Sequence, residues 1–103
     1  MARLLVVELA VTPLGTAKTG LSDYIAKAVG AVKASGVKYK VCPTCTVFEA
    51  GDVKTAFEVA RAAHEAVLAT GVKRVLTTVK IDDRLDQPRG MDERVQRVTA
   101  KVK

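Results

Sequence analysis

Aromatic and amide side chains are scarce in this chain. Its 103 residues include no Trp, two Tyr and two Phe, and Asn is absent. An RNA-binding sheet stacks bases on exposed aromatic rings, so the shortage of aromatics argues against that class of protein. The depletion of thermolabile amides, with no Asn and two Gln, fits a thermophilic source. No apolar run approaches the roughly 20 residues that span a bilayer, so we expect no membrane segment.

Positive charge prevails, because 17 Lys+Arg against 11 Asp+Glu give a formal net charge of +6. The basic residues are spread along the chain and are not interleaved with aromatics, so nucleic-acid binding is only a minor alternative. Glu8 interrupts the short apolar start, which we expect to be a strand and not a signal peptide. We therefore expect a cytoplasmic protein with one domain over residues 1–103.

The pattern of apolar residues, caps and breakers predicts seven elements. They are a strand over 4–12 ending at Pro13, a helix capped by Ser22 and ended by Gly36, strands over 37–42 and 45–49, a helix capped by Asp52 and ended by Gly71, a strand over 74–81, and a short helix over 91–102. The order β-α-β-β-α-β predicts an α+β, ferredoxin-like antiparallel sheet with both main helices on one face, plus a C-terminal helix.

One face of this predicted sheet is left without helices. Alternation places Glu8, Thr12, Thr78 and Lys80 on it, among apolar side chains. In a ferredoxin-like sheet the first strand pairs with the fourth, so Glu8 and Lys80 lie close enough to form an ion pair or a shared pocket. The apolar side chains are Leu4, Val6 and Leu76. We expect a partner subunit to cover this face and a ligand pocket to form between subunits.

The motif Cys42-Pro43-Thr44-Cys45 flanks a turn between two predicted strands. It lacks the following helix that lowers the pKa of a thioredoxin-type cysteine. A zinc site needs two further ligands, and His64 is the other strong candidate. Inert thiols are the favoured interpretation, and a local disulfide or a metal or redox site remains an alternative. We expect no metal.

No catalytic set is recognisable. His64 lies on a predicted amphipathic helix without triad partners, so we expect a structural role for it. Neither of the two glycine motifs that bind nucleotides, G-x-x-x-x-G-K-[ST] and G-x-G-x-x-G, is present. We therefore expect no cofactor. The run Lys80-Ile81-Asp82-Asp83-Arg84 is typical of a solvated loop. Its alternative interpretation is an enzyme or regulator that uses Lys80, Asp82 and Asp83 on a small anionic ligand.

Five segments nevertheless form a recognisable series. They are Val7-Glu8-Leu9, Thr12-Pro13-Leu14-Gly15-Thr16, Pro43-x-x-Thr46-Val47-Phe48-Glu49, Ala63-His64-Glu65-Ala66 and the run from Arg74 to Arg84. The series resembles the small thiamine-binding protein family, the YkoF-like group of ferredoxin-like proteins, over nearly the whole chain. The chain differs from that family at the hairpin, where Cys45 stands in the place usually held by Gly.

The resemblance implies binding of thiamine, or of its hydroxymethylpyrimidine moiety, without catalysis. An aminopyrimidine edge offers both donors and acceptors, and the cationic thiazolium favours a neighbouring carboxylate. The expected ligand-binding residues are Glu8, Thr12, Pro13, Leu14, Gly15, Thr46, Glu49, Thr78, Lys80 and Asp82. The open sheet face and an apolar stripe from Met91 to Val102 further predict a homotetramer built as a dimer of dimers.

Overall fold

Four strands form one antiparallel sheet in the order β2-β3-β1-β4. The computed structural model describes residues 3–103. Its elements are β1 (Leu5–Leu14), α1 (Ser22–Ala34), β2 (Tyr39–Val41), β3 (Thr46–Ala50), α2 (Val53–Leu68), β4 (Arg74–Asp83) and α3 (Met91–Thr99). This order and topology confirm the predicted α+β, ferredoxin-like fold with a C-terminal helix.

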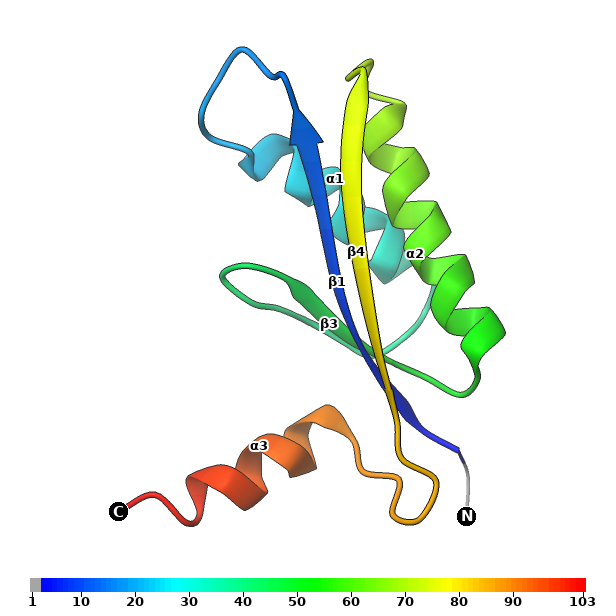
Figure 1. Ribbon diagram of the computed structural model, residues 1–103, viewed down its shortest axis with the longest axis vertical. Coiled ribbons are helices and arrows are strands. Elements are labelled where there is room, and N and C mark those ends of the chain that lie inside the picture. The colour runs from blue at the N-terminus through cyan, green and yellow to red at the C-terminus, as the bar shows by residue number, and fades with distance from the viewer. Residues whose placement is uncertain (1–2) are drawn as a thin grey trace.

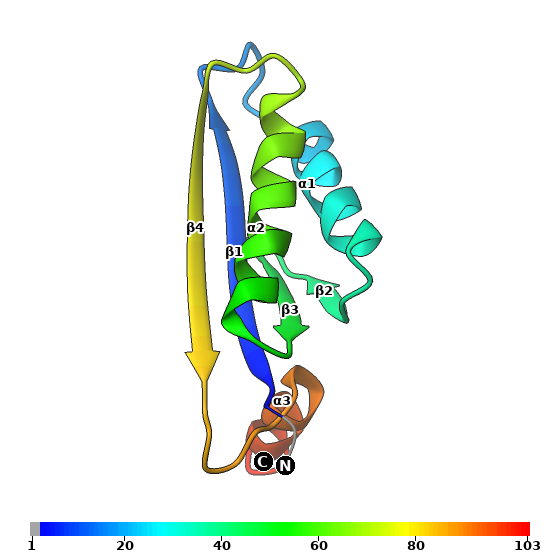
Figure 2. The same cartoon turned by 90° about the vertical axis from the view of Figure 1, so that its right-hand side faces the viewer.

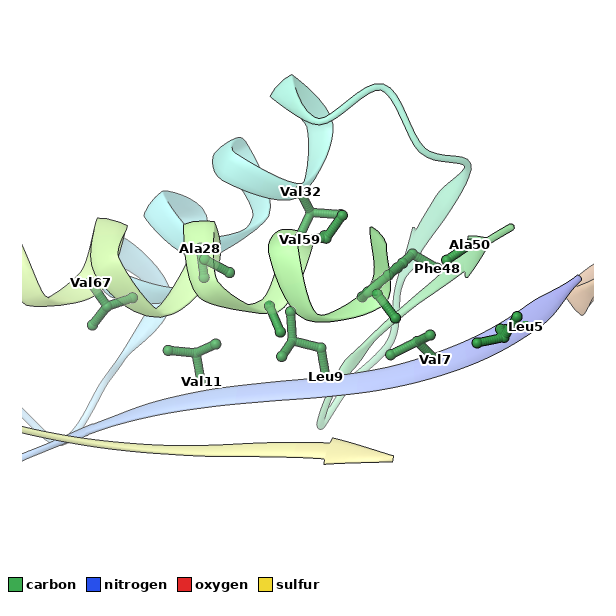
Figure 3. Packing of buried hydrophobic residues seen from close by; sticks show 13 residues of the cluster. Leu5, Val7, Leu9, Val11, Ala28, Val32, Phe48, Ala50, Val59 and Val67 are labelled. Atoms are coloured by element: carbon green, nitrogen blue, oxygen red, sulfur yellow. The ribbon is translucent and has the colours of Figure 1, made fainter. Parts of the chain in front are cut away.

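Both long helices cover the same face of the sheet, and β1 and β4 turn their other face away from them (Figure 2). The core lies between the two layers, because alternate residues of β1 point toward α1 and α2 (Figure 3). Val7 and Phe48 are fully buried there, and Val32 and Val67 meet them from the helices. The predicted helix-facing side of β1 is therefore confirmed. Its members are Leu5, Val7, Leu9 and Val11.

Strand β1 continues through Pro13, which the sequence pattern predicts to be its end. It pairs with β4 over all ten residues but with β3 only over Leu5–Leu9. Beyond Leu9, β1 is thus an edge strand on its β3 side, and an edge strand tolerates a proline that has no N–H to donate.

The helix boundaries mostly follow the predicted signals. Asp52 caps α2, since its side chain accepts a hydrogen bond from the Thr55 N–H at 2.7 Å. Gly36 and Gly71 follow α1 and α2 with φ of +79° and +98°. Ser22, however, is the first residue of α1 and not its cap. Leu21 holds the cap position because its carbonyl accepts the first helical hydrogen bonds.

Helix α3 lies apart from the two-layer body, at the end of the sheet where β1 begins and β4 ends (Figure 1). Met91, its first residue, is buried. The remaining members of the predicted stripe, Val95, Val98 and Val102, are 57%, 63% and 71% exposed. A single chain therefore leaves most of this stripe uncovered. None of the helices within residues 3–103 has the length and apolarity needed to cross a membrane.

Candidate functional site

Glu8 and Lys80 lie directly opposite each other on adjacent strands, and Val47 of β3 lies on the other side of Glu8. All three side chains are on the helix-free face. Glu8 and Lys80 are both exposed, and among residues 3–103 they form no ion pair with each other. Two opposite charges therefore stand side by side without pairing with each other. This arrangement favours a shared pocket over a buried ion pair.

Threonine hydroxyls continue this polar line along the two long strands. Thr78 lies opposite Ala10, and Thr12 lies opposite Leu76. Thr78 is exposed, and Leu76 is 58% exposed. The helix-free face thus places a carboxylate, an ammonium and two hydroxyls next to exposed apolar surface, which is the composition of small-molecule sites.

The Cys45 thiol is close enough to Glu8 for the two groups to interact. The pKa of Cys45 is raised to about 11, chiefly by burial and in the same direction by the Glu8 carboxylate and the Cys42 thiol. Both cysteines are free, and the turn between them is closed by a hydrogen bond from the Cys42 N–H to the Cys45 carbonyl at 2.8 Å. A protonated, partly buried thiol therefore borders the carboxylate. This residue was not among the expected ligand-binding residues.

Glu49 and Asp82 also lie on the helix-free face, on either side of Val6, but both hold α3. The Glu49 carboxylate accepts a hydrogen bond from the Met91 N–H at 2.8 Å. Asp82 forms an ion pair with Arg94. Negative charge at the first turn of a helix is stabilising, so Glu49 acts as a cap supplied by a distant strand.

Four expected site residues lie away from Glu8. Thr46 pairs with Leu9, which puts it on the helix-facing side, and it is 6% exposed. It lines a cavity of about 90 Å³ between α1, β1 and the β2–β3 turn, which is small beside the ~300–1,000 Å³ of typical ligand pockets. Pro13, Leu14 and Gly15 follow Glu8 by five to seven residues, or about 17–23 Å of strand.

The charged run at the end of β4 does not form one cluster. Asp83 follows Asp82 and therefore points to the opposite face. It forms a bidentate contact with Arg3, which holds the pKa of the Asp83 carboxyl below its usual range. Asp82 is held by Arg94. The alternative in which Lys80, Asp82 and Asp83 act together on one anion thus loses its geometric basis.

His64 links α2 to the helix-facing side of β4. Its Nδ1 lies 2.6 Å from the Thr77 hydroxyl, and the pair is partly buried. This contact between two elements is consistent with the structural role expected of His64. Within residues 3–103, no group of three or more His, Cys, Asp or Glu side chains is arranged to hold a metal ion.

Comparison with known proteins gives one consistent family. The model of the family described as thiamine-binding protein matches residues 7–99. A UPF0045 protein of Methanothermobacter thermautotrophicus is 48% identical over 95 residues, covering 92% of this chain and 96% of its own. A UPF0045 protein of Staphylococcus xylosus is 40% identical, with 90% of each chain covered.

Solved structures agree with the fold. A hypothetical protein of Methanocaldococcus jannaschii has a TM-score of 0.84 at 30% identity, covering 94% of this chain and 97% of its own. A Thermotoga maritima protein, proposed to act in thiamine biosynthesis or salvage, has a TM-score of 0.76 at 21% identity, with 92% and 98% covered. The resemblance noted in the sequence is confirmed, and the chain belongs to the thiamine-binding protein family.

Proposed function

We propose that this protein binds thiamine through its aminopyrimidine ring, without catalysing a reaction, on the helix-free face of the sheet. The observation that carries the proposal is the juxtaposition of Glu8 and Lys80, exposed and not paired with each other, on an apolar face of a chain from this family. A carboxylate accepts hydrogen bonds from the ring's amino group, and an ammonium donates to a ring nitrogen. The Thr78 hydroxyl can both donate and accept such hydrogen bonds.

The pocket is completed by a second copy of the chain. A single sheet face is open to water, and a small molecule on it would keep much of its surface hydrated. Most ligand sites bury 70–90% of the ligand, so a covering subunit is needed. The exposed Leu76 and the stripe Val95, Val98 and Val102 supply apolar surface for such an assembly. We propose a homotetramer built as a dimer of dimers.

The chemistry of the site supports binding and not turnover. Glu8 has no histidine or second carboxylate opposite it on β3 or β4, and its nearest thiol, Cys45, is kept protonated at neutral pH by its raised pKa. Neither a nucleophile nor an acid–base pair is thus assembled around Glu8. The free thiols of Cys42 and Cys45 fit the reducing cytoplasm, which we propose as the location.

Titration calorimetry with thiamine, free hydroxymethylpyrimidine and the isolated thiazole alcohol tests the proposal. We expect thiamine and the pyrimidine to bind, and to compete with each other, because the aminopyrimidine makes the specific hydrogen bonds. The thiazole alone should bind far more weakly. Binding of the thiazole without the pyrimidine would overturn the assignment of the ring, and absence of heat with all three compounds would overturn the function.

A further inference from the structure

A second concave site lies at the α3 end of the molecule, outside the Glu8–Lys80 site. Its cavity, of about 520 Å³, is bounded by the end of β4, the following loop and α3. Basic side chains dominate its wall, and Asp82 is the one acidic residue among those that line it within residues 3–103. The basic residues are Arg84, Arg89, Arg94, Arg97 and Lys101.

Arg94 is fixed at the base of this cluster with one nitrogen unused. Its Nη1 forms the ion pair with Asp82, and its Nε donates to the Arg89 carbonyl at 3.0 Å. The remaining Nη2 is buried and has no hydrogen-bond partner among the described residues. A buried charged donor without an acceptor is rare in folded proteins. The rest of the Arg94 side chain is partly exposed, so Arg94 adds positive charge to this wall while its Nη2 stays shielded from solvent.

Two further basic residues of this wall are available to a ligand. Arg97 follows Arg94 by three residues, a spacing that places both on one side of α3, and Lys101 lies in the turn just after α3 and lines the same cavity. Arg84 and Arg89 pair with Asp86 and Glu93. Within residues 3–103, Arg97 and Lys101 take part in none of the ion pairs.

The charge balance indicates the class of ligand. Five cations face three carboxylates, those of Asp82, Asp86 and Glu93, which leaves an excess of two positive charges. A phosphoryl group carries close to two negative charges at neutral pH and accepts paired hydrogen bonds from guanidinium groups. We propose that this cavity binds a phosphoryl group, held by Arg97 and Lys101 beside the positive charge of Arg94.

This site does not depend on the thiamine proposal, and the experiment keeps the two apart. Calorimetry at low ionic strength, in a buffer free of phosphate and sulfate, uses three probes: inorganic phosphate, thiamine monophosphate and thiamine. Arg97→Gln and Lys101→Gln are the test variants, because neither side chain supports the fold through an ion pair. Arg74→Gln is the matched control, since it removes the same charge at the opposite end of β4.

We expect inorganic phosphate to bind the unaltered protein and to lose about tenfold in affinity in each test variant, as one charge-assisted hydrogen bond is removed. Arg74→Gln should keep the affinity for phosphate, and thiamine should bind all variants equally. If thiamine monophosphate displaces inorganic phosphate, the occupant is a phosphate ester. If it does not, the occupant is the free anion. Either result supports the site. Absence of phosphate binding, or equal weakening by Arg74→Gln, would overturn it.

Discussion

The Glu49 carboxylate connects the sheet to α3 by accepting a hydrogen bond from the Met91 N–H. We expect Glu49→Ala to lower the free energy of unfolding by roughly 0.5–2 kcal/mol, the usual cost of losing a cap. Glu49→Gln should lose less, because its amide oxygen still accepts. Hydrogen exchange at the first-turn amides of α3 measures the effect locally. If Glu49→Gln instead weakened thiamine binding and left α3 protected, Glu49 would belong to the ligand site.

The Cys45 thiol makes stability depend on alkaline pH. Its pKa is raised from about 9 to about 11 in the folded protein. Between these values the unfolded chain has lost the proton that the folded chain keeps, so raising the pH favours unfolding. We expect the urea midpoint to fall more steeply between pH 9 and 11 for the unaltered protein than for Cys45→Ser, both under reducing conditions. Parallel curves would show that the thiol is not perturbed.

Alternation along β1 and β4 was enough to predict where Glu8, Thr78 and Lys80 lie. It succeeded because both strands are long, every second position of β1 is buried, and β4 alternates half-buried positions such as Val75, Val79 and Ile81 with exposed ones. Thr46 could not be placed in this way. Strand β3 has five residues, and only its pairing with Leu9 and Val41 sets Thr46 on the helix-facing side. The same register explains why Cys45 borders Glu8, since Cys45 lies two residues before Val47, which pairs with Glu8.

At the scale of whole elements, the helices were well predicted because their signals are local. Asp52 caps α2 through its own neighbour Thr55, and Gly36 and Gly71 end helices within one turn. The docking of α3 was not predictable, because it depends on tertiary contacts: Glu49 reaches Met91 from a strand 42 residues away, and Asp82 pairs with Arg94 across the loop after β4. Its spacing of apolar residues predicted a helix and an apolar stripe, but not which side chains would hold it.

Two glycines near α1 have opposite expected effects when they are replaced. Gly30 lies within the helix, with no atom within 4 Å of an added Cβ. Gly30→Ala should therefore raise the free energy of unfolding by about 0.5–1 kcal/mol. Gly36 has a φ of +79°, so Gly36→Ala should lower it by roughly 1–2 kcal/mol. Urea unfolding at one protein concentration measures both. Equal effects of the same sign would contradict this account of α1.

At the scale of the whole molecule, the helix-free face should govern assembly. We expect Leu76→Glu to dissociate the proposed oligomer into 11.0 kDa chains, because like charges would then face each other in an apolar interface. Phe57→Glu is the matched control, since Phe57 is 55% exposed on α2, in the other layer. Sedimentation velocity at micromolar concentration measures both. Dissociation by Phe57→Glu alone would move the interface to the helices.

The most direct test of the central claim is the affinity for thiamine, by calorimetry, of the unaltered protein and of Glu8→Gln, with the melting temperature of each. Gln keeps the shape of Glu8 and removes its charge. Loss of one charge-assisted hydrogen bond, worth roughly 1.5–3 kcal/mol, predicts about a ten- to hundredfold fall in affinity at an unchanged melting temperature. Glu65→Gln, on exposed α2 surface, should change neither. Unchanged affinity with a lowered melting temperature in Glu8→Gln would contradict the account and leave Glu8 a structural residue.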